Sequence, residues 1–261
     1  MPTHFKKLLA CSVCTLIGVI AILATAALAV GPDTIQRVKP SVVAVGTFER
    51  TRSPAFRFLG TGFAVGDGSL VATNAHVLPA LLDPELRETV VVAIPSGGLD
   101  PRLQEVKAVA VNRAYDVALL RMSGARLQPL VLGDSSRVRE GNNYLFTGYP
   151  LGSVLGLFQV THHAMISALA PIAIPSPDAR HLDSATLKRL SVGAYSIFQL
   201  DGVAYPGNSG SPLYDPETGE VVAVINMVFV KGTKEAALSQ PSGITYAIPI
   251  QALKDLLTTV E

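Results

Sequence analysis

His76, Asp116 and Ser209 have the side-chain types that catalysis by an activated hydroxyl requires. A hydroxyl is a weak nucleophile that needs an adjacent base, and the base needs a third group to fix its tautomer. Ser209 lies in a segment of turn-forming residues, Tyr205-Pro206-Gly207-Asn208-Ser209-Gly210-Ser211-Pro212-Leu213. Alone, this segment is more typical of a surface turn than of a catalytic loop. Two upstream segments, one ending at His76 and one beginning at Asp116, favour the catalytic interpretation.

The order of the three residues distinguishes between hydrolase classes. Histidine, aspartate and then serine is the order of the chymotrypsin arrangement, whereas α/β-hydrolases and subtilisins have other orders. The segment Gly207 to Ser211 also lacks the last glycine of the G-x-S-x-G elbow. A carboxylate within an apolar strand is costly to bury unless it is paired, and an imidazole partner for Asp116 would remove that cost. The N–H groups of Gly207 and Ser209, with a contribution from Asn208, are predicted to stabilise an oxyanion.

Three segments resemble the catalytic motifs of trypsin-like serine proteases, most closely those of the bacterial HtrA/Deg branch. They are Thr73-Asn74-Ala75-His76-Val77, Asp116-Val117-Ala118-Leu119-Leu120 and Gly207-Asn208-Ser209-Gly210-Ser211-Pro212-Leu213. Gly148 to Gly152, Asp201 and Gly243 to Pro249 also resemble segments of that branch. The resemblance covers about residues 41 to 258. Ser211 departs from the pattern, which has a second glycine there: a serine is strained if the position needs a positive φ, and otherwise its hydroxyl crowds the site.

The resemblance implies a role for each residue. Ser209 would attack the scissile carbonyl, His76 would transfer the proton, and Asp116 would orient His76. The substrate's P1 side chain would lie against Val203, Ala204 and Tyr205, with Asn226, Met227 and Val228 as the opposite wall of the pocket. No carboxylate lies in that floor, so the expected P1 residue is small or medium aliphatic.

From Ser41 onward, short β-rich runs alternate with Gly, Pro and Asp, which is typical of an all-β sandwich or barrel. The resemblance implies two six-stranded antiparallel barrels of the chymotrypsin type, at about residues 41–126 and 140–248. Helical spacing of apolar residues is clear only at Ile250, Leu253 and Leu256, which predicts a C-terminal helix within 249–261. The domain is expected to span 41–261 after an N-terminal segment at 30–40, with no residues left for a PDZ domain.

The N-terminus has the features of an export signal. Two lysines precede an uncharged stretch from Leu8 to Val30 that contains the small-residue cleavage signal Ala27-Leu28-Ala29. A signal peptide at 1–29 is therefore predicted, with an uncleaved membrane anchor as the alternative. Both interpretations place the folded part outside the cytoplasm, in the periplasm or the extracellular space. Both cysteines of the chain, Cys11 and Cys14, lie in this stretch.

Composition argues against several partners. The formal net charge of +1 does not suggest a nucleic-acid partner. Adjacent residues of a strand point to opposite faces, so His162 and His163 are poorly placed to chelate one metal ion. No cofactor or metal is expected, and the oligomeric state is left open.

Two functions remain open at this point. One is an exported serine endopeptidase that cleaves proteins through an acyl-enzyme, with a role in envelope quality control. The other is a latent or non-catalytic module that binds extended peptides on the same fold. The loops at 176–192 and 229–243 are hypothesised to regulate the oxyanion turn.

Overall fold

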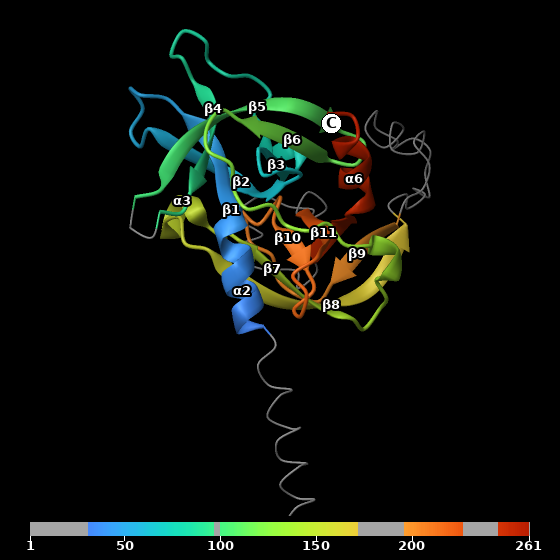
Figure 1. Cartoon of the computed structure of the whole chain (residues 1–261). Coiled ribbons are helices and arrows are strands. Elements are labelled where there is room, and N and C mark those ends of the chain that lie inside the picture. The colour runs from blue at the N-terminus through green and yellow to red at the C-terminus, as the bar shows by residue number, and fades with distance from the viewer. Residues whose placement is uncertain (1–30, 97–99, 172–195, 227–244, 261) are drawn as a thin grey trace, which may run out of the picture.

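The computed structural model describes residues 31–96, 100–171, 196–226 and 245–260, and they form two closed six-stranded barrels (Figure 1). The first has the strand order β1-β2-β3-β6-β5-β4, and the second, read from β7, has the order β7-β8-β9-β12-β11-β10. The two barrels therefore share one topology. The predicted all-β, two-barrel fold is confirmed.

All strand pairs within the barrels are antiparallel. The first barrel consists of β1 (Val42–Phe48), β2 (Phe56–Val65), β3 (Leu70–Thr73), β4 (Thr89–Ile94), β5 (Arg102–Asn112) and β6 (Val117–Met122). The second consists of β7 (Asn143–Gly148), β8 (Val160–Pro171), β9 (Ser196–Leu200), β10 (Pro212–Tyr214), β11 (Val221–Asn226) and β12 (Thr245–Pro249). The helical elements are α2 (Pro32–Val38), α3 (Gly152–Leu155) and α6 (Gln251–Leu257), with 3-10 turns η1 (Lys39–Ser41), η2 (Ala75–Val77) and η3 (Ser135–Arg137).

The strand β1 is apolar along most of its length because both of its faces are buried. Val43 and Val45 of β1 pack in the barrel interior, whereas Val42 and Ala44 pack in a second cluster outside it. Successive side chains of a strand point to opposite faces, so a strand buried on both faces loses the alternation of apolar and polar residues. The β-branched residues of β1 suit such a strand.

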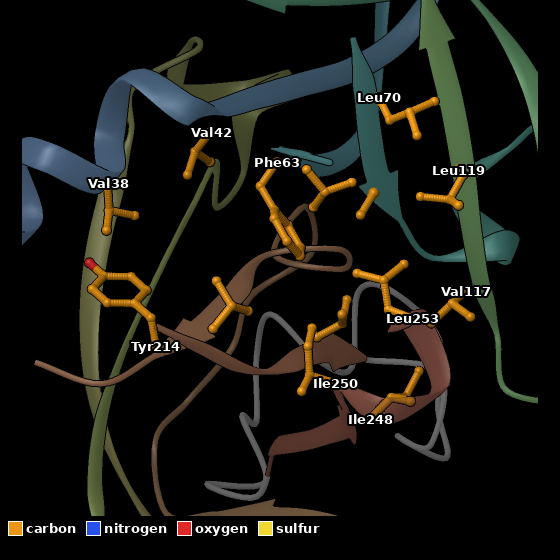
Figure 2. Close-up of a cluster of buried hydrophobic side chains, with 14 of the residues drawn as sticks. Val38, Val42, Phe63, Leu70, Val117, Leu119, Tyr214, Ile248, Ile250 and Leu253 are labelled. Carbon is orange, nitrogen blue, oxygen red and sulfur yellow. The ribbon is translucent and has the colours of Figure 1, made fainter. Parts of the chain in front are cut away.

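That second cluster joins the two barrels (Figure 2). Side chains of the first barrel, such as Phe63 and Leu119, pack in it with Tyr214 and Ile248 of the second. Leu253 of α6 is fully buried in the same cluster, and α6 packs against β5 and β6. This shared core fixes the barrels relative to each other, and loops from both reach the region around Ser209.

Among the elements that were not predicted, α2 and β10 show why short elements are missed. The helix α2 has only seven residues and begins with Pro32, so its apolar spacing is too short to be recognised. Its Thr34 hydroxyl donates to the Glu217 carbonyl at 3.2 Å. The strand β10 has only three residues and follows the Ser209 turn directly, and pairing with β7 through Leu213 and Phe146 places it in the barrel.

No helix of the described residues has the length and apolar character needed to cross a bilayer. The predicted signal peptide at 1–29 and the hypothesised regulatory loops at 176–192 and 229–243 lie wholly outside the described residues.

Candidate active site

The His76 side chain is held by Asp116. Asp116 Oδ2 lies 2.6 Å from His76 Nδ1, and Oδ1 accepts the His76 backbone N–H at 2.8 Å. A carboxylate only accepts hydrogen bonds, so Nδ1 carries the proton and Nε2 is left as the acceptor. The arrangement thus presents the basic nitrogen of the imidazole away from Asp116.

Asp116 itself is fixed by its backbone. Its φ of +53° is unusual for a residue with a Cβ, although aspartate tolerates this region better than most. The Asp116 carbonyl accepts the Ala75 N–H at 3.2 Å and the Asn74 side-chain amide at 3.0 Å. Since Asp116 precedes β6 and Asn74 precedes η2, these bonds connect the two segments that carry the acid and the imidazole.

Asn226 makes a contact that the sequence analysis did not predict. It was expected in the wall of the substrate pocket, but its side-chain amide donates to Asp116 Oδ2 at 2.8 Å. Asp116 therefore accepts from two residues on different barrels, His76 and Asn226. This contact joins residues 110 positions apart, which no local pattern could indicate.

Ser209 is the second residue of the second of two successive turns. The Asn208 N–H donates to the Tyr205 carbonyl at 2.9 Å across a turn with Gly207 at its third position and a φ of +105°. The Ser211 N–H donates to the Asn208 carbonyl at 3.0 Å across a second turn, with Gly210 at φ +87°. A positive φ at the third position is the reason that such turns need glycine. Ser209 is 7% exposed.

Two N–H groups of this loop are free. Neither the Gly207 nor the Ser209 N–H has an acceptor among the described residues. The Asn208 N–H is engaged in the first turn, and the Asn208 side-chain amide is buried with no partner in the described part of the chain. The loop therefore offers the two N–H groups of Gly207 and Ser209 to an incoming oxyanion.

The first barrel supports the Ser209 loop through Thr61, a residue that the sequence analysis missed. Its N–H donates to the Ser209 carbonyl at 2.8 Å, and its hydroxyl donates to the Gly207 carbonyl at 2.7 Å. The same hydroxyl accepts the Tyr149 N–H at 3.1 Å. Thr61 lies between Gly60 and Gly62, and glycines within a strand are a signal of close backbone approach.

Val77, the residue after His76, and the Ser209 carbonyl both lie close to Gly60. A Cβ at Gly60 would be 2.8 Å from Val77 Cγ2 and 3.1 Å from the Ser209 carbonyl oxygen. The Gly210 N–H also donates to the Ile225 carbonyl at 2.9 Å, one residue before Asn226. No hydrogen bond joins the side chains of His76 and Ser209 in the described part of the chain. Catalytic hydrogen bonds are often long without substrate, so this geometry does not argue against the pair.

Ser211 has an ordinary backbone conformation. It is not among the residues with positive φ, so the serine adds no backbone strain. Its hydroxyl is buried and has no hydrogen-bond partner within the described ranges, and a Cβ at Gly148 would lie 2.0 Å from it. The sequence analysis gave two consequences of a serine at this position, backbone strain or crowding of the site by the hydroxyl. The structure favours the second.

The predicted pocket residues are only partly described. Val203 and Tyr205 are half-buried and Ala204 is buried, with its N–H donating to the Thr245 hydroxyl at 2.8 Å. Met227 and Val228 lie outside the described residues. Asp201 does not point a free carboxylate at this region, because its Oδ1 accepts the Met165 N–H at 2.7 Å.

His162 stacks on Phe146, with ring centroids 4.8 Å apart and an angle of 18° between the rings, and His163 is exposed. The His162 Nε2 atom is buried and has no hydrogen-bond partner among the residues that the structure describes. Burial lowers the pKa of His162, because the charged form of a buried ring is costly. Among the described residues, no three His, Cys, Asp or Glu side chains could together hold a metal ion.

We expect His162→Phe to stabilise the fold by about 1 kcal/mol, because it keeps the ring stack and removes a buried unpaired nitrogen. The gain should grow as the pH falls through about 6.5, since the unfolded wild-type chain then takes up a proton that the folded state resists. Thermal melting at pH 8 and pH 5 checks this. His163→Phe is the matched control and should show little change. Equal melting temperatures of wild type and His162→Phe at pH 5 would contradict the prediction.

Comparison with known proteins agrees with this architecture. Residues 60–224 match the family model described as a trypsin-like peptidase domain. The chain is 28% identical over 203 residues to a probable periplasmic serine endoprotease, DegP-like, of Halomonas elongata, covering 77% of this chain and 34% of the relative. It is 27% identical over 236 residues to Protease Do-like 5, chloroplastic, of Arabidopsis thaliana, covering 85% of this chain and 66% of that relative.

A solved HtrA-type protease, AlgW with a tripeptide, superimposes with a TM-score of 0.62 at 22% identity, covering 87% of this chain and 62% of that one. That likeness supports the fold. The chain spans about a third of the length of the first curated relatives that it matches.

Proposed function

This chain belongs to the trypsin-like peptidase family, and from that premise we propose that it is a serine endopeptidase in which Ser209, His76 and Asp116 form the catalytic triad. The observation that carries the proposal is the pair of bonds by which Asp116 holds His76 Nδ1 and the His76 backbone. That pair fixes the tautomer that a general base requires.

In the proposed reaction, the Ser209 hydroxyl attacks the scissile carbonyl while its proton passes to His76 Nε2. The carbonyl oxygen becomes an oxyanion, which the N–H groups of Gly207 and Ser209 stabilise. His76 then returns the proton to the leaving amine, and an acyl-enzyme remains on Ser209. Water, deprotonated by His76, releases the acyl group by the same steps in reverse order. Asp116 stabilises the His76 imidazolium during both acylation and deacylation.

Asn226 would act as a positioning residue in this mechanism. Its amide donates to Asp116 Oδ2, the same oxygen that faces His76 Nδ1. A second donor on that oxygen limits rotation of the carboxylate, so the imidazole is held in one orientation.

The substrates proposed are extended or unfolded segments of proteins, cleaved after small or medium aliphatic residues. The buried Ala204 and the half-buried Val203 supply apolar surface beside the Ser209 loop. Asp201 is the nearest carboxylate in the sequence before Ser209, and its engagement with the Met165 N–H argues against a preference for Lys or Arg.

We also propose that the chain is exported, because residues 1–29 have the pattern of a signal peptide and several relatives are named periplasmic. N-terminal sequencing of the mature protein tests the cleavage site after Ala29. A role in envelope quality control would follow from cleavage of unfolded proteins there.

The experiment is turnover of unfolded casein and of a peptide library by the full-length chain, beside Ser209→Ala. The proposal expects casein fragments with wild type only, and library cleavage mainly after Val, Ala, Ile or Leu. Cleavage that persists in Ser209→Ala would assign the activity elsewhere. Cleavage after Lys or Arg would overturn the proposed pocket.

The alternative is a latent or non-catalytic peptide-binding module. One observation favours it: the His76 and Ser209 side chains share no hydrogen bond in the described part of the chain. Peptide binding by wild type without any turnover would support this alternative.

A further inference from the structure

In the first barrel, β5 extends beyond its pairing with β4, and the space beside this extension is called the seam below. The strand β5 runs from Arg102 to Asn112, but β4 pairs only with its residues Arg102 to Glu105. On its other edge, β5 pairs with β6 from Val106 to Asn112. The edge of β5 from Val106 onward therefore faces no partner strand among the described residues. Figure 1 shows β4 and β5 side by side at one end of the first barrel.

A cavity of about 680 Å³ fills this seam. Its volume falls within the range of sites that bind ligands. Apolar side chains from three strands and from the loop after η2 line it, among them Leu78, Leu82, Val90, Val106, Val109 and Met122. Leu82 and Val109 are each 38% exposed, so part of the apolar surface is open to solvent.

Cations surround this apolar surface. Lys107, Arg113 and Arg121 line the cavity, and no carboxylate oxygen of the described residues lies within 4 Å of their charged groups. Lys107 and Arg121 are direct cross-strand partners, which is an unfavourable arrangement for like charges. The lining of the cavity therefore carries positive charges whose mutual repulsion a bound anionic group would reduce.

The carboxylates of the seam do not cancel this charge. Glu88 is bound by Arg52 at 2.8 Å, and the Thr47 hydroxyl with that guanidinium lowers the pKa of Glu88 to about 2. Glu105 is the one other acid in the lining, against three cations.

We propose that this seam binds an extended segment of a polypeptide substrate in which apolar and acidic residues alternate. This inference rests on the proposed function, since it supplies a second contact for the substrate. An added strand would satisfy the open edge of β5 with main-chain hydrogen bonds. Because alternate side chains of a strand point to opposite faces, its apolar residues would enter the cavity and its carboxylates would meet Lys107 and Arg121. A fatty acid could use the cavity and the cations but not the strand edge.

The seam adjoins the segments that carry His76 and Asp116. Leu78 lies in the cavity wall, and its N–H donates to the Ala75 carbonyl at 3.3 Å across the turn that contains His76. At the other side, the Asn112 side chain accepts the N–H groups of Ala114 and Tyr115, directly before Asp116. A polypeptide held in the seam therefore lies close to the segments that would cleave it.

The test uses full-length Ser209→Ala protein and a fluorescein-labelled peptide of alternating valine and glutamate, with binding measured by anisotropy. The proposal expects the peptide to bind, and expects the double variant Lys107→Gln/Arg121→Gln to raise Kd about fivefold, as for the loss of two exposed ion pairs. Arg102→Gln is the matched control, because Arg102 is an exposed cation on β5 outside the cavity. It should leave Kd unchanged.

Three results would overturn the proposal. A valine–lysine peptide that binds as tightly as the valine–glutamate peptide would exclude charge recognition. Binding of dodecanoate at the seam without binding of either peptide would assign the seam to a fatty acid. Dimerisation of the protein that Lys107→Gln/Arg121→Gln abolishes would assign it to a second copy of the chain.

A catalytic readout keeps this inference separate from the proposed function. In the otherwise wild-type chain, Lys107→Gln/Arg121→Gln should raise KM for a long valine–glutamate substrate and leave kcat unchanged. Labelling of Ser209 by a fluorophosphonate should be the same with and without the double substitution. Loss of labelling in both proteins would contradict the proposed function, whereas normal labelling with an unchanged KM would contradict only the second site.

Discussion

Asp116→Asn is expected to lower kcat by about 10⁴-fold while the protein remains folded. The carboxylate accepts from His76 Nδ1, the His76 N–H and the Asn226 amide, and an amide side chain cannot accept all three. Either the His76 imidazole adopts the other tautomer, or the N–H₂ group of the new side chain faces one of these hydrogen-bond donors. Asparagine tolerates the Asp116 φ of +53° about as well as aspartate, so the backbone should hold.

The measurement is steady-state hydrolysis of a peptide substrate together with thermal unfolding. Asp67→Asn is the matched control. Asp67 also accepts hydrogen bonds from a backbone N–H and a side-chain hydroxyl, both of Ser69, but it lies at the surface. Asp67→Asn should keep full activity. If Asp116→Asn kept kcat within tenfold of wild type, the role assigned to Asp116 would be wrong.

Gly207→Ala is expected to lower kcat/KM by about 10²- to 10³-fold, the effect of losing an oxyanion donor. Gly207 has a φ of +105°, and a Cβ there would lie 2.3 Å from the Tyr149 carbonyl oxygen. Because the clash is with backbone, the turn itself must move, and the Gly207 N–H moves with it. Peptide hydrolysis and thermal unfolding measure the outcome.

Gly141→Ala separates the effect on the site from the cost of the conformation. Gly141 has a φ of +86°, but a Cβ there would meet nothing within 4 Å. It should therefore lose about 1 kcal/mol of stability and keep its activity. Gly207→Ala with the activity of Gly141→Ala would show that the turn at Gly207 is not used to stabilise the reaction.

The fold was predictable because its signals are local or shared by many relatives. Valine-rich runs such as Val42 to Phe48 end at turn residues, and β1 has those bounds in the structure. The same runs do not show which residues face the barrel interior, since β1 is buried on both faces. Which side chains of β1 lie in the barrel interior and which lie in the cluster between the barrels depends on how the second barrel packs against the first.

The site was predictable in its residue types but only partly in its contacts. Asp116 was expected to be a buried carboxylate within a strand, whereas its side chain is 20% exposed and the residue precedes β6. The physical reason for its pairing is therefore the set of donors around it rather than the cost of full burial.

Supporting contacts were missed because the residues that make them are distant from each other in the sequence. Thr61 contacts Gly207, and Asn226 contacts Asp116, across 146 and 110 positions. A polar residue between two glycines, or at the end of an apolar strand, does not reveal which distant group it will meet. Such contacts follow from barrel closure and from the packing of one barrel on the other.

The most direct test of the account is labelling of the full-length protein with a fluorophosphonate probe, beside Ser209→Ala. A probe of this kind reacts only with a serine whose base and oxyanion donors are assembled. The account predicts strong labelling of wild type and none of Ser209→Ala. Wild type that stays unlabelled, with and without added unfolded protein, would contradict the assignment of His76, Asp116 and Ser209 as a working catalytic site.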